Sequence, residues 1–233
     1  MIKSFPKVPC LHAVIAIILF PIFSNAEESV ETITVTAQKR EQAINEVGIS
    51  ISTLSSRQIK SAELSDSTEI SQQIPGLQVN TWSPTLTTFN LRGVSQNNFT
   101  DNLEAPVAVY SDEVYIGSMN ALNAQLFDVK RIEVLRGPQG TLFGRNATGG
   151  LIHYISQDAS AKEANGYFES TFSDYNTRSL EGAVGGAVSE NVRARFAGRW
   201  EKGDGYVKAT VPGVRDIGGR NGYSARGSIQ VDF

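Results

Sequence analysis

Apolar and polar residues alternate with a period of two through most of the chain beyond Gly166. In residues 191–200 and 222–233, small, aliphatic or aromatic side chains take every second position, and mostly polar side chains fill the positions between. Residues 180–188 repeat the pattern, and residues 167–175 show it more weakly. Because successive side chains of a strand point to opposite faces, each run predicts a β-strand with one apolar and one polar face.

Two kinds of protein contain such strands: a soluble antiparallel sheet buried on one face, or a membrane β-barrel with a lipid face and a lumen face. The barrel is favoured because arginines recur on the polar face and because aromatic Trp200, Tyr223 and Phe233 stand at strand ends, where membrane interfaces lie. Residues 189–191 predict a tight periplasmic turn. Residues 201–221, polar and glycine-rich, predict a long external loop.

The first residues have the pattern of an export signal. Lys3 and Lys7 precede an apolar stretch over residues 11–23, and small residues at Ser24 and Ala26 predict cleavage after Ala26. The apolar stretch is shorter than the roughly 20 residues of a membrane-spanning helix. An uncleaved N-terminal anchor is the alternative, and the cleaved signal peptide is favoured.

Cleavage would also remove Cys10, the one cysteine of the 233 residues. The mature chain could then hold neither a disulfide nor a cysteine-based metal site. The formal net charge is −3, so the chain has no electrostatic basis for general nucleic-acid binding.

Residues 31–37, Glu-Thr-Ile-Thr-Val-Thr-Ala, alternate as a strand does. They lie close to the new N-terminus and are followed by polar residues 38–41, with no predicted neighbour for pairing. Two possibilities remain open: a frayed terminus, or a strand edge that pairs with another protein. The residues alone favour the frayed terminus.

Residues 47–143 predict a compact mixed α/β unit. A helical pattern covers residues 59–74, with Asp66 and Glu69 resembling a capping box and Pro75-Gly76 ending the helix. A second short helix is expected over residues 122–129, and Asp112-Glu113 should form a turn. Strands are expected at residues 47–52, 77–79, 89–91, 107–110, 114–116, 132–135 and 151–155.

Glycines cluster within a short stretch of the chain, at Gly137, Gly140, Gly144, Gly149 and Gly150. They permit tight turns and close approach of backbones. A phosphate-binding loop requires a lysine after its last glycine, and a dinucleotide-binding fingerprint requires a following helix. This stretch has no such lysine, and a strand is expected after it. We therefore expect structural glycines and no nucleotide cofactor.

The sequence gives no indication of an enzyme or a metal site. His153 is the only histidine after the export signal, and it lies in a β-prone run, which favours a packed strand residue over a catalytic base. Neither a nucleophile elbow nor a His-Glu-x-x-His zinc motif is present. We expect no catalytic residue, no metal ligand and no cofactor.

Residues 131–156, RIEVLRGPQGTLFGRNATGGLIHYIS, resemble the plug-domain signature of TonB-dependent outer-membrane receptors. Residues 89–94, FNLRGV, resemble the second plug signature, and residues 31–37 resemble the TonB box that precedes the plug. The order of these segments is also that of the family: signal peptide, TonB box, plug and barrel strands.

The resemblance implies a mixed α/β plug followed by antiparallel transmembrane β-strands of an incomplete barrel. The expected division is a signal peptide over residues 1–26, a TonB-box segment and linker over 27–45, a plug over 46–160, and the first strands, about four, over 166–233. Single-chain barrels have at least about eight strands and plugged transporters about 22. We therefore expect one complete plug and the first arc of a barrel.

The resemblance also assigns roles to residues. Arg92 and Arg136 would pair with carboxylates on the inner wall of the barrel, although solvated surface charges are the alternative. TonB would bind strand to strand at Glu31, Thr32, Ile33, Thr34, Val35, Thr36 and Ala37. The apex loops over residues 80–88 and 95–104 would contact ligand through Trp82, Gln96, Asn97, Asn98 and Phe99.

The implied activity is energy-coupled uptake of a scarce ligand across the outer membrane, with TonB and outer-membrane lipid as partners. A ferric siderophore is the common cargo of the family, and cobalamin, haem or carbohydrate are alternatives. A periplasmic module that binds TonB without transporting anything is a different class. An autotransporter or a small porin is disfavoured, since neither requires the glycine-rich loop over residues 137–150.

Overall fold

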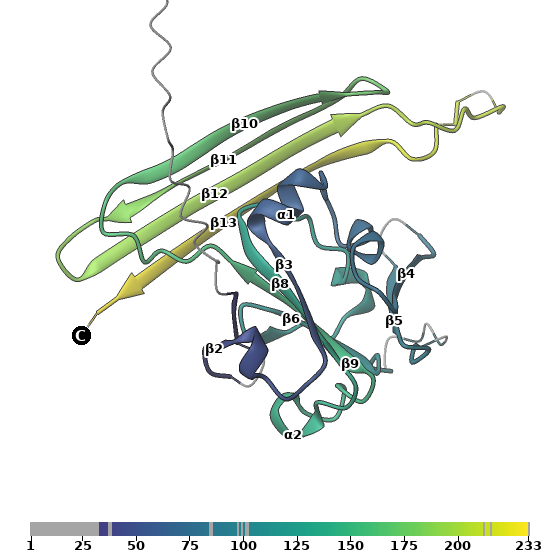
Figure 1. Ribbon diagram of the computed structural model, residues 1–233. Coiled ribbons are helices and arrows are strands. Elements are labelled where there is room, and N and C mark those ends of the chain that lie inside the picture. The colour runs from purple at the N-terminus through teal and green to yellow at the C-terminus, as the bar shows by residue number, and fades with distance from the viewer. Residues whose placement is uncertain are drawn as a thin grey trace, which may run out of the picture. The chain divides into compact units, whose positions relative to one another are not determined.

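The computed structural model describes residues 33–36, 39–83, 86–96, 98, 100, 103–211, 213–214 and 216–232. The predicted signal peptide, residues 1–26, lies outside these ranges. Within them, none of the helices combines the length and apolar character needed to cross a membrane. The two largest sheets of the described chain are one of five strands and one of four long strands (Figure 1).

The five-stranded sheet has the order β3-β8-β9-β6-β7. It comprises β3 (Ile51–Ser55), β6 (Val107–Ser111), β7 (Val114–Tyr115), β8 (Val129–Arg136) and β9 (Gly150–Ser156). β6 and β9 are parallel, and the other neighbours are antiparallel. The predicted strands over residues 132–135 and 151–155 form its centre, where nearly continuous apolar runs are buried on both faces.

Each face of this sheet packs a separate apolar core. Ile132, Val134 and Ile152 contribute to the larger core, which also contains Ile70 and Phe89. The larger core includes residues of η2 (Glu69–Gln72), η3 (Met119–Ala121) and the hairpin of β4 (Leu77–Thr81) with β5 (Thr87–Leu91). The smaller core joins Leu135 and Leu151 to residues of α2 (Gly140–Phe143) and of the N-terminal segment.

Two predicted elements differ from the structure. The strand expected over residues 47–52 begins only at Ile51, after η1 (Ile44–Glu46). The helix expected over residues 122–129 is absent, and Val129 already belongs to β8. The reason is tertiary: Leu126 donates its N–H to the carbonyl of Ser65, and Ala124 donates to Ser67 Oγ. These amides bond to a distant segment, so the local helix does not form.

The predicted helix over residues 59–74 is divided into α1 (Ser56–Ser61) and η2. Its expected capping box is also wrong. Asp66 accepts the N–H of Thr68 in a local turn, and Glu69 accepts the N–H of Ser65. The capping box of this region is at Ser55 and Gln58, where the side chain of each accepts the backbone N–H of the other.

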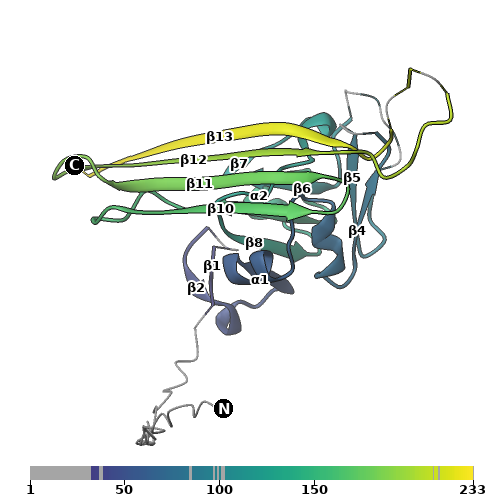
Figure 2. The same ribbon diagram turned by 90° about the horizontal axis from the view of Figure 1, so that it is seen from above.

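The second sheet contains β10 (Asn165–Ser173), β11 (Thr177–Ala187), β12 (Val192–Gly203) and β13 (Arg220–Val231), antiparallel and in sequence order (Figure 2). Residues 189–191 lie in the short connection between β11 and β12, as predicted, and the long connection between β12 and β13 spans residues 204–219.

The alternation predicted for these strands is confirmed by the register. Ala183, Ala197 and Arg226 are neighbours on one face, and Val184, Phe196 and Gly227 are neighbours one step along, on the other. The first face contacts the part of the chain built around the five-stranded sheet, called the plug-like unit below, through Phe127 and Asp128. The second exposes large apolar side chains: Phe168, Phe172, Leu180, Val184, Phe196, Trp200, Tyr223 and Ile229.

Candidate functional site

The N-terminal segment is a docked strand rather than a frayed terminus. β1 (Thr34–Val35) pairs antiparallel with β2 (Gln42–Ala43), because the chain reverses at Lys39, which has a φ of 58° and donates its N–H to the carbonyl of Thr36 over 2.8 Å. The expectation that this segment lacks a neighbour for pairing is therefore wrong. Of its predicted partner-binding residues, Glu31, Thr32 and Ala37 lie outside the described residues.

Burial of one side chain and bonds to a buried ion pair hold the segment against the five-stranded sheet. Val35 is fully buried in the core that contains Leu135 and Leu151. Thr36 donates its N–H to Glu133 Oε1 over 2.8 Å, and Glu133 also accepts Arg131 Nε at 2.7 Å. The side chain of Glu133 is fully buried. Sequence reasoning missed Glu133, although a carboxylate inside an apolar strand was a visible signal for it.

His153 is a buried strand residue, as predicted. It lies opposite Glu133 in the pairing of β8 with β9, and its Nε2 accepts the N–H of Glu113 at 3.3 Å. Burial lowers the pKa of His153 below the ordinary histidine value, although the nearby carboxylates of Glu113 and Glu133 act in the opposite direction. A neutral imidazole acting as an acceptor fits this position.

Arg92 and Arg136 lie around the turn at Pro75 and Gly76. Arg136 donates to Ser52 Oγ at 2.7 Å and to the carbonyl of Pro75, and Arg92 donates to Ser50 Oγ at 2.9 Å. Burial lowers the pKa of Arg136, and the positive charge of Arg92 adds to this effect. Among the residues that the structure describes, neither guanidinium forms an ion pair. Their predicted pairing with barrel carboxylates stays a prediction.

The residues predicted to contact ligand lie in two loops. Trp82 follows β4, is 60% exposed, and directs its indole Nε1 to Thr88 Oγ1 at 3.4 Å. Gln96 donates to the carbonyl of Asn98 at 2.9 Å, and the side chain of Asn98 accepts the N–H of Thr100. The structure thus brings Gln96 and Asn98 together. Asn97 and Phe99 lie outside its described residues.

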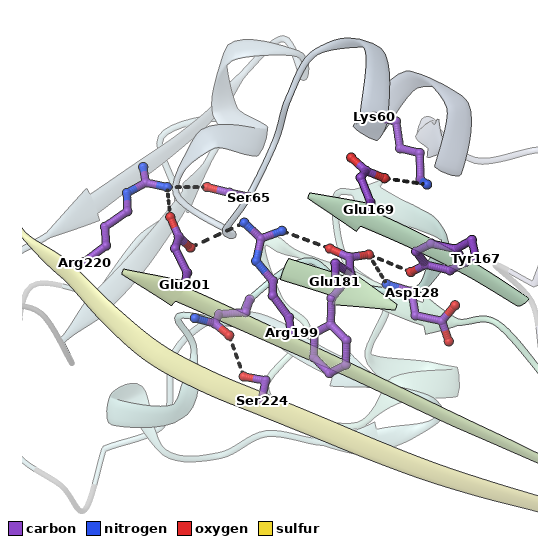
Figure 3. Close-up of polar contacts among 12 residues, drawn as sticks. Lys60, Ser65, Asp128, Tyr167, Glu169, Glu181, Arg199, Glu201, Arg220 and Ser224 are labelled. Carbon is purple, nitrogen blue, oxygen red and sulfur yellow. Dashed lines mark hydrogen bonds and ion pairs between the residues drawn. The ribbon is translucent and has the colours of Figure 1, made fainter. Parts of the chain in front are cut away.

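A ladder of alternating charges joins the plug-like unit to the four-stranded sheet (Figure 3). Arg199 binds Glu181 at 3.0 Å and Glu201 at 3.3 Å. Arg220 extends the ladder from Glu201, at 2.8 Å, to Glu69 of η2, at 3.2 Å. Sequence reasoning noted arginines on one face of the strands but did not identify their partners.

A cavity of about 920 Å³ opens beside this ladder, between α1 and the sheet. Lys60 and Glu69 line it from the plug-like unit, and Tyr167, Glu181 and Arg220 line it from the strands. Lys60 binds Glu169 at 3.0 Å and lies over the ring of Tyr167. The interface is therefore polar and partly hollow rather than a packed apolar core.

Comparison with known proteins identifies the plug-like unit. Residues 43–151 match the TonB-dependent receptor plug domain. The chain belongs to the TonB-dependent receptors. It corresponds to an N-terminal portion of such a receptor, and the five-stranded sheet is the centre of its plug.

Relatives at the sequence level are receptors and transporters rather than enzymes. The pesticin receptor of Yersinia pestis is 31% identical over 180 residues, which cover 75% of this chain and 26% of that protein. The vitamin B12 transporter BtuB of Vibrio vulnificus (strain YJ016) is 30% identical over 237 residues, which cover 96% of this chain and 36% of that protein. The chain thus spans about a quarter to a third of the length of these relatives.

Solved receptors have the same fold. The ferric yersiniabactin uptake receptor FyuA from Yersinia pestis superposes with a TM-score of 0.66 at 29% identity, over 73% of this chain and 27% of that one. The pyoverdine outer membrane receptor FpvA from Pseudomonas aeruginosa PAO1 superposes with a TM-score of 0.63 at 17% identity, over 77% of this chain and 26% of that one. The second likeness concerns the fold alone.

Proposed function

We propose that the chain is part of an outer-membrane receptor that takes up a scarce ligand with energy delivered by TonB. One observation carries the proposal: a plug domain is followed in the same chain by a sheet of long strands with an exposed apolar outer face. The proposed division keeps a cleaved signal peptide at residues 1–26, the TonB-box segment and linker at 27–45, the plug at 46–160 and the first barrel strands at 166–233.

The properties of the second sheet support membrane-spanning strands. β10 to β13 have 9 to 12 residues, close to the roughly 9–11 that cross a bilayer when tilted. Trp200 and Tyr223 are register partners on the outer face and stand near the long connection between β12 and β13. Interfacial aromatic residues take such positions. The outer face would therefore contact outer-membrane lipid.

The docked N-terminal segment supports residues 31–37 as the TonB-binding strand. Among the described residues, two residue pairs join β1 to β2, with one further hydrogen bond from the N–H of Ile44 to the carbonyl of Ile33. A partner strand could therefore replace β2 by exchanging a short ladder, which is strand addition to a sheet edge. In this proposal Glu133 holds the segment on the plug until TonB takes it.

The ligand remains a choice among classes, and a ferric siderophore is favoured. FyuA, at 29% identity, is described as a ferric yersiniabactin uptake receptor. Cobalamin is the alternative with support, because BtuB is a vitamin B12 transporter at 30% identity, and haem or carbohydrate remain alternatives. The proposed contacts are at the plug apex: Trp82, Gln96, Asn97, Asn98 and Phe99.

We also propose that Arg92 and Arg136 face carboxylates of barrel strands beyond β13. Two guanidiniums around one turn repel each other, and Arg136 is partly desolvated. An acidic partner would relieve both effects. A groove beside them, lined by Gln72, Pro75 and Asn90 among others, leaves room for such a side chain.

An Ile33→Pro substitution in the full-length protein tests the function. Proline lacks an N–H and fixes φ, so it should prevent pairing of this segment with a partner strand. Uptake of radiolabelled ferric yersiniabactin and of radiolabelled cyanocobalamin is measured in parallel in the parent and in the variant. We expect the variant to lose uptake of the ligand that the parent protein transports. Binding at the cell surface should remain, and Ile33→Val is the matched control. Persistent uptake by the proline variant would refute the assignment of the TonB-binding strand.

A further inference from the structure

Asp128 of the plug is held by two neighbouring strands of the barrel sheet. Its side chain is 1% exposed. Arg195 of β12 binds both carboxylate oxygens, with Nε at 2.8 Å from Oδ2. Arg226 of β13 lies 3.4 Å from Oδ2 and donates to the backbone carbonyl of Asp128 at 2.6 Å. One buried carboxylate thus receives two guanidiniums from two strands.

The surroundings of Asp128 add contacts of other kinds. Phe127 packs against Ala183 and Ala197 in a small apolar cluster, and the guanidinium of Arg226 lies 4.9 Å from the centre of the Phe127 ring. Glu181 of β11 accepts the N–H of Asp128 at 3.3 Å. Three successive strands therefore hold the same short plug segment.

The attachment continues along the sheet. Ser224 of β13 bonds to Gln125, and Arg220 donates to Ser65 at 2.8 Å. By contrast, the described part of the N-terminal segment is held by two ladder pairs, the N–H of Ile44 to the carbonyl of Ile33, the burial of Val35, and the bonds of Thr36 to Glu133 and Arg131. The plug thus has one face that several strands of the second sheet hold, and an N-terminal end that is held by fewer bonds.

We propose that the Asp128 clamp, defined as Asp128 with Arg195 and Arg226, is the fixed attachment of the plug to the barrel wall. This face stays closed when TonB acts, and the passage for ligand opens on another face of the plug. The inference rests on the proposed function and specifies where the plug can move.

The physical reason is the cost of separating the clamp. Opening this face would break both ion pairs of Asp128, the bond of Arg226 to its backbone carbonyl and the packing of Phe127 in a single step. Opening the N-terminal end breaks few bonds. Local opening follows the elements with the fewest buried contacts, so force applied through residues 33–36 should disturb that end first.

Labelling of an engineered cysteine tests the proposal in the full-length receptor, in a background free of other cysteines. Ala197→Cys lies beside the clamp, where the residue is 1% exposed. Cells are treated with a small permeant maleimide, with and without a proton uncoupler. We expect slow labelling that does not depend on energy. Adding Asp128→Asn should raise the labelling rate at least about tenfold, and adding Lys130→Gln, the matched control, should not.

Two results would overturn the proposal: faster labelling of Ala197→Cys in energised cells, or unchanged labelling when Asp128→Asn is added. If the asparagine variant does not assemble, Arg226→Gln removes one guanidinium instead and should raise the labelling rate severalfold. Labelling of a second variant, Val35→Cys, distinguishes failure of the clamp proposal from failure of the proposed function. If labelling of Val35→Cys is the same with and without the uncoupler, TonB coupling is refuted. The comparison with and without Asp128→Asn still tests the clamp in that case.

Discussion

Glu133 shows how one side chain links the core of the plug to its N-terminal segment. It is fully buried in β8, between the guanidinium of Arg131 and the backbone N–H of Thr36. A buried carboxylate is tolerated only when its oxygens are bonded. The docked segment therefore completes the bonding of Glu133, and the two depend on each other.

We predict that Glu133→Gln releases the segment. The amide can still accept a hydrogen bond but leaves the buried cation of Arg131 without an anionic partner, which costs about 3 kcal/mol. Hydrogen exchange at the amide of Thr36 should therefore accelerate by about a hundredfold. Glu113→Gln is the control, because that side chain is 54% exposed. Unchanged exchange in Glu133→Gln would show that the burial of Val35 alone holds the segment.

His153 makes the stability of the plug sensitive to mild acid. Burial lowers its pKa in the folded state, so below the unfolded value of about 6.5 the unfolded chain binds the proton more strongly. The contribution of neutral His153 to the free energy of unfolding is therefore complete above pH 6.5. It is lost as the pH falls below 6.5, with a limiting slope of about 1.4 kcal/mol per pH unit. Denaturation of the purified full-length receptor at pH 7.5 and 5.5 should show this loss. His153→Gln should reduce it, and equal pH dependence in both proteins would contradict the assignment.

At the scale of elements, the plug depends on a close approach of β9 to its neighbours. Gly150 begins β9 with a φ of 137°, and a Cβ there would lie 2.3 Å from the carbonyl oxygen of Leu135 and 2.6 Å from Leu91 Cδ2. The expectation that this glycine allows backbones to approach closely is confirmed. No side chain larger than hydrogen fits without moving the central strands.

Gly150→Ala should therefore destabilise the plug by about 3 kcal/mol or more, through overpacking and an unfavourable φ. Gly48→Ala is the matched control, since a Cβ at Gly48 would meet nothing within 4 Å, and its effect should stay within about 0.5 kcal/mol. Denaturant titration of the two variants measures the difference. Similar stabilities would contradict the role given to Gly150.

The elements that the sequence predicted well are those whose local pattern of apolar and polar side chains defines the faces of a strand. The central strands of the plug and the alternation of β10 to β13 belong to this group. The prediction failed where a segment bonds to a distant one, as residues 122–129 do with Ser65 and Ser67. The docking of β1 and the Asp128 clamp were missed for the same reason, because local pattern does not reveal a partner far along the chain.

At the scale of the whole molecule, the second sheet has two different environments. Its inner face carries the charge ladder and the clamp, and its outer face exposes aromatic and aliphatic side chains along its length. A patch of this kind on a monomeric soluble protein marks a binding surface. A receptor and a soluble periplasmic module that binds TonB would use this outer face differently, so the face distinguishes the two functions.

A receptor should enter the outer-membrane fraction and migrate differently on gels with and without heating, whereas the module should be soluble. Phe196→Arg places a charge at mid-strand on the outer face, which costs about 2–4 kcal/mol at the bilayer midplane. We therefore expect less heat-modifiable protein in the outer membrane. Thr171→Arg is the matched control and should assemble normally. Thr171 lines the cavity, on the opposite face of β10 from its exposed neighbour Phe172. If both the parent and the Phe196→Arg variant are instead found in the soluble fraction in equal amounts, the periplasmic module is favoured, because no lipid would then contact this face.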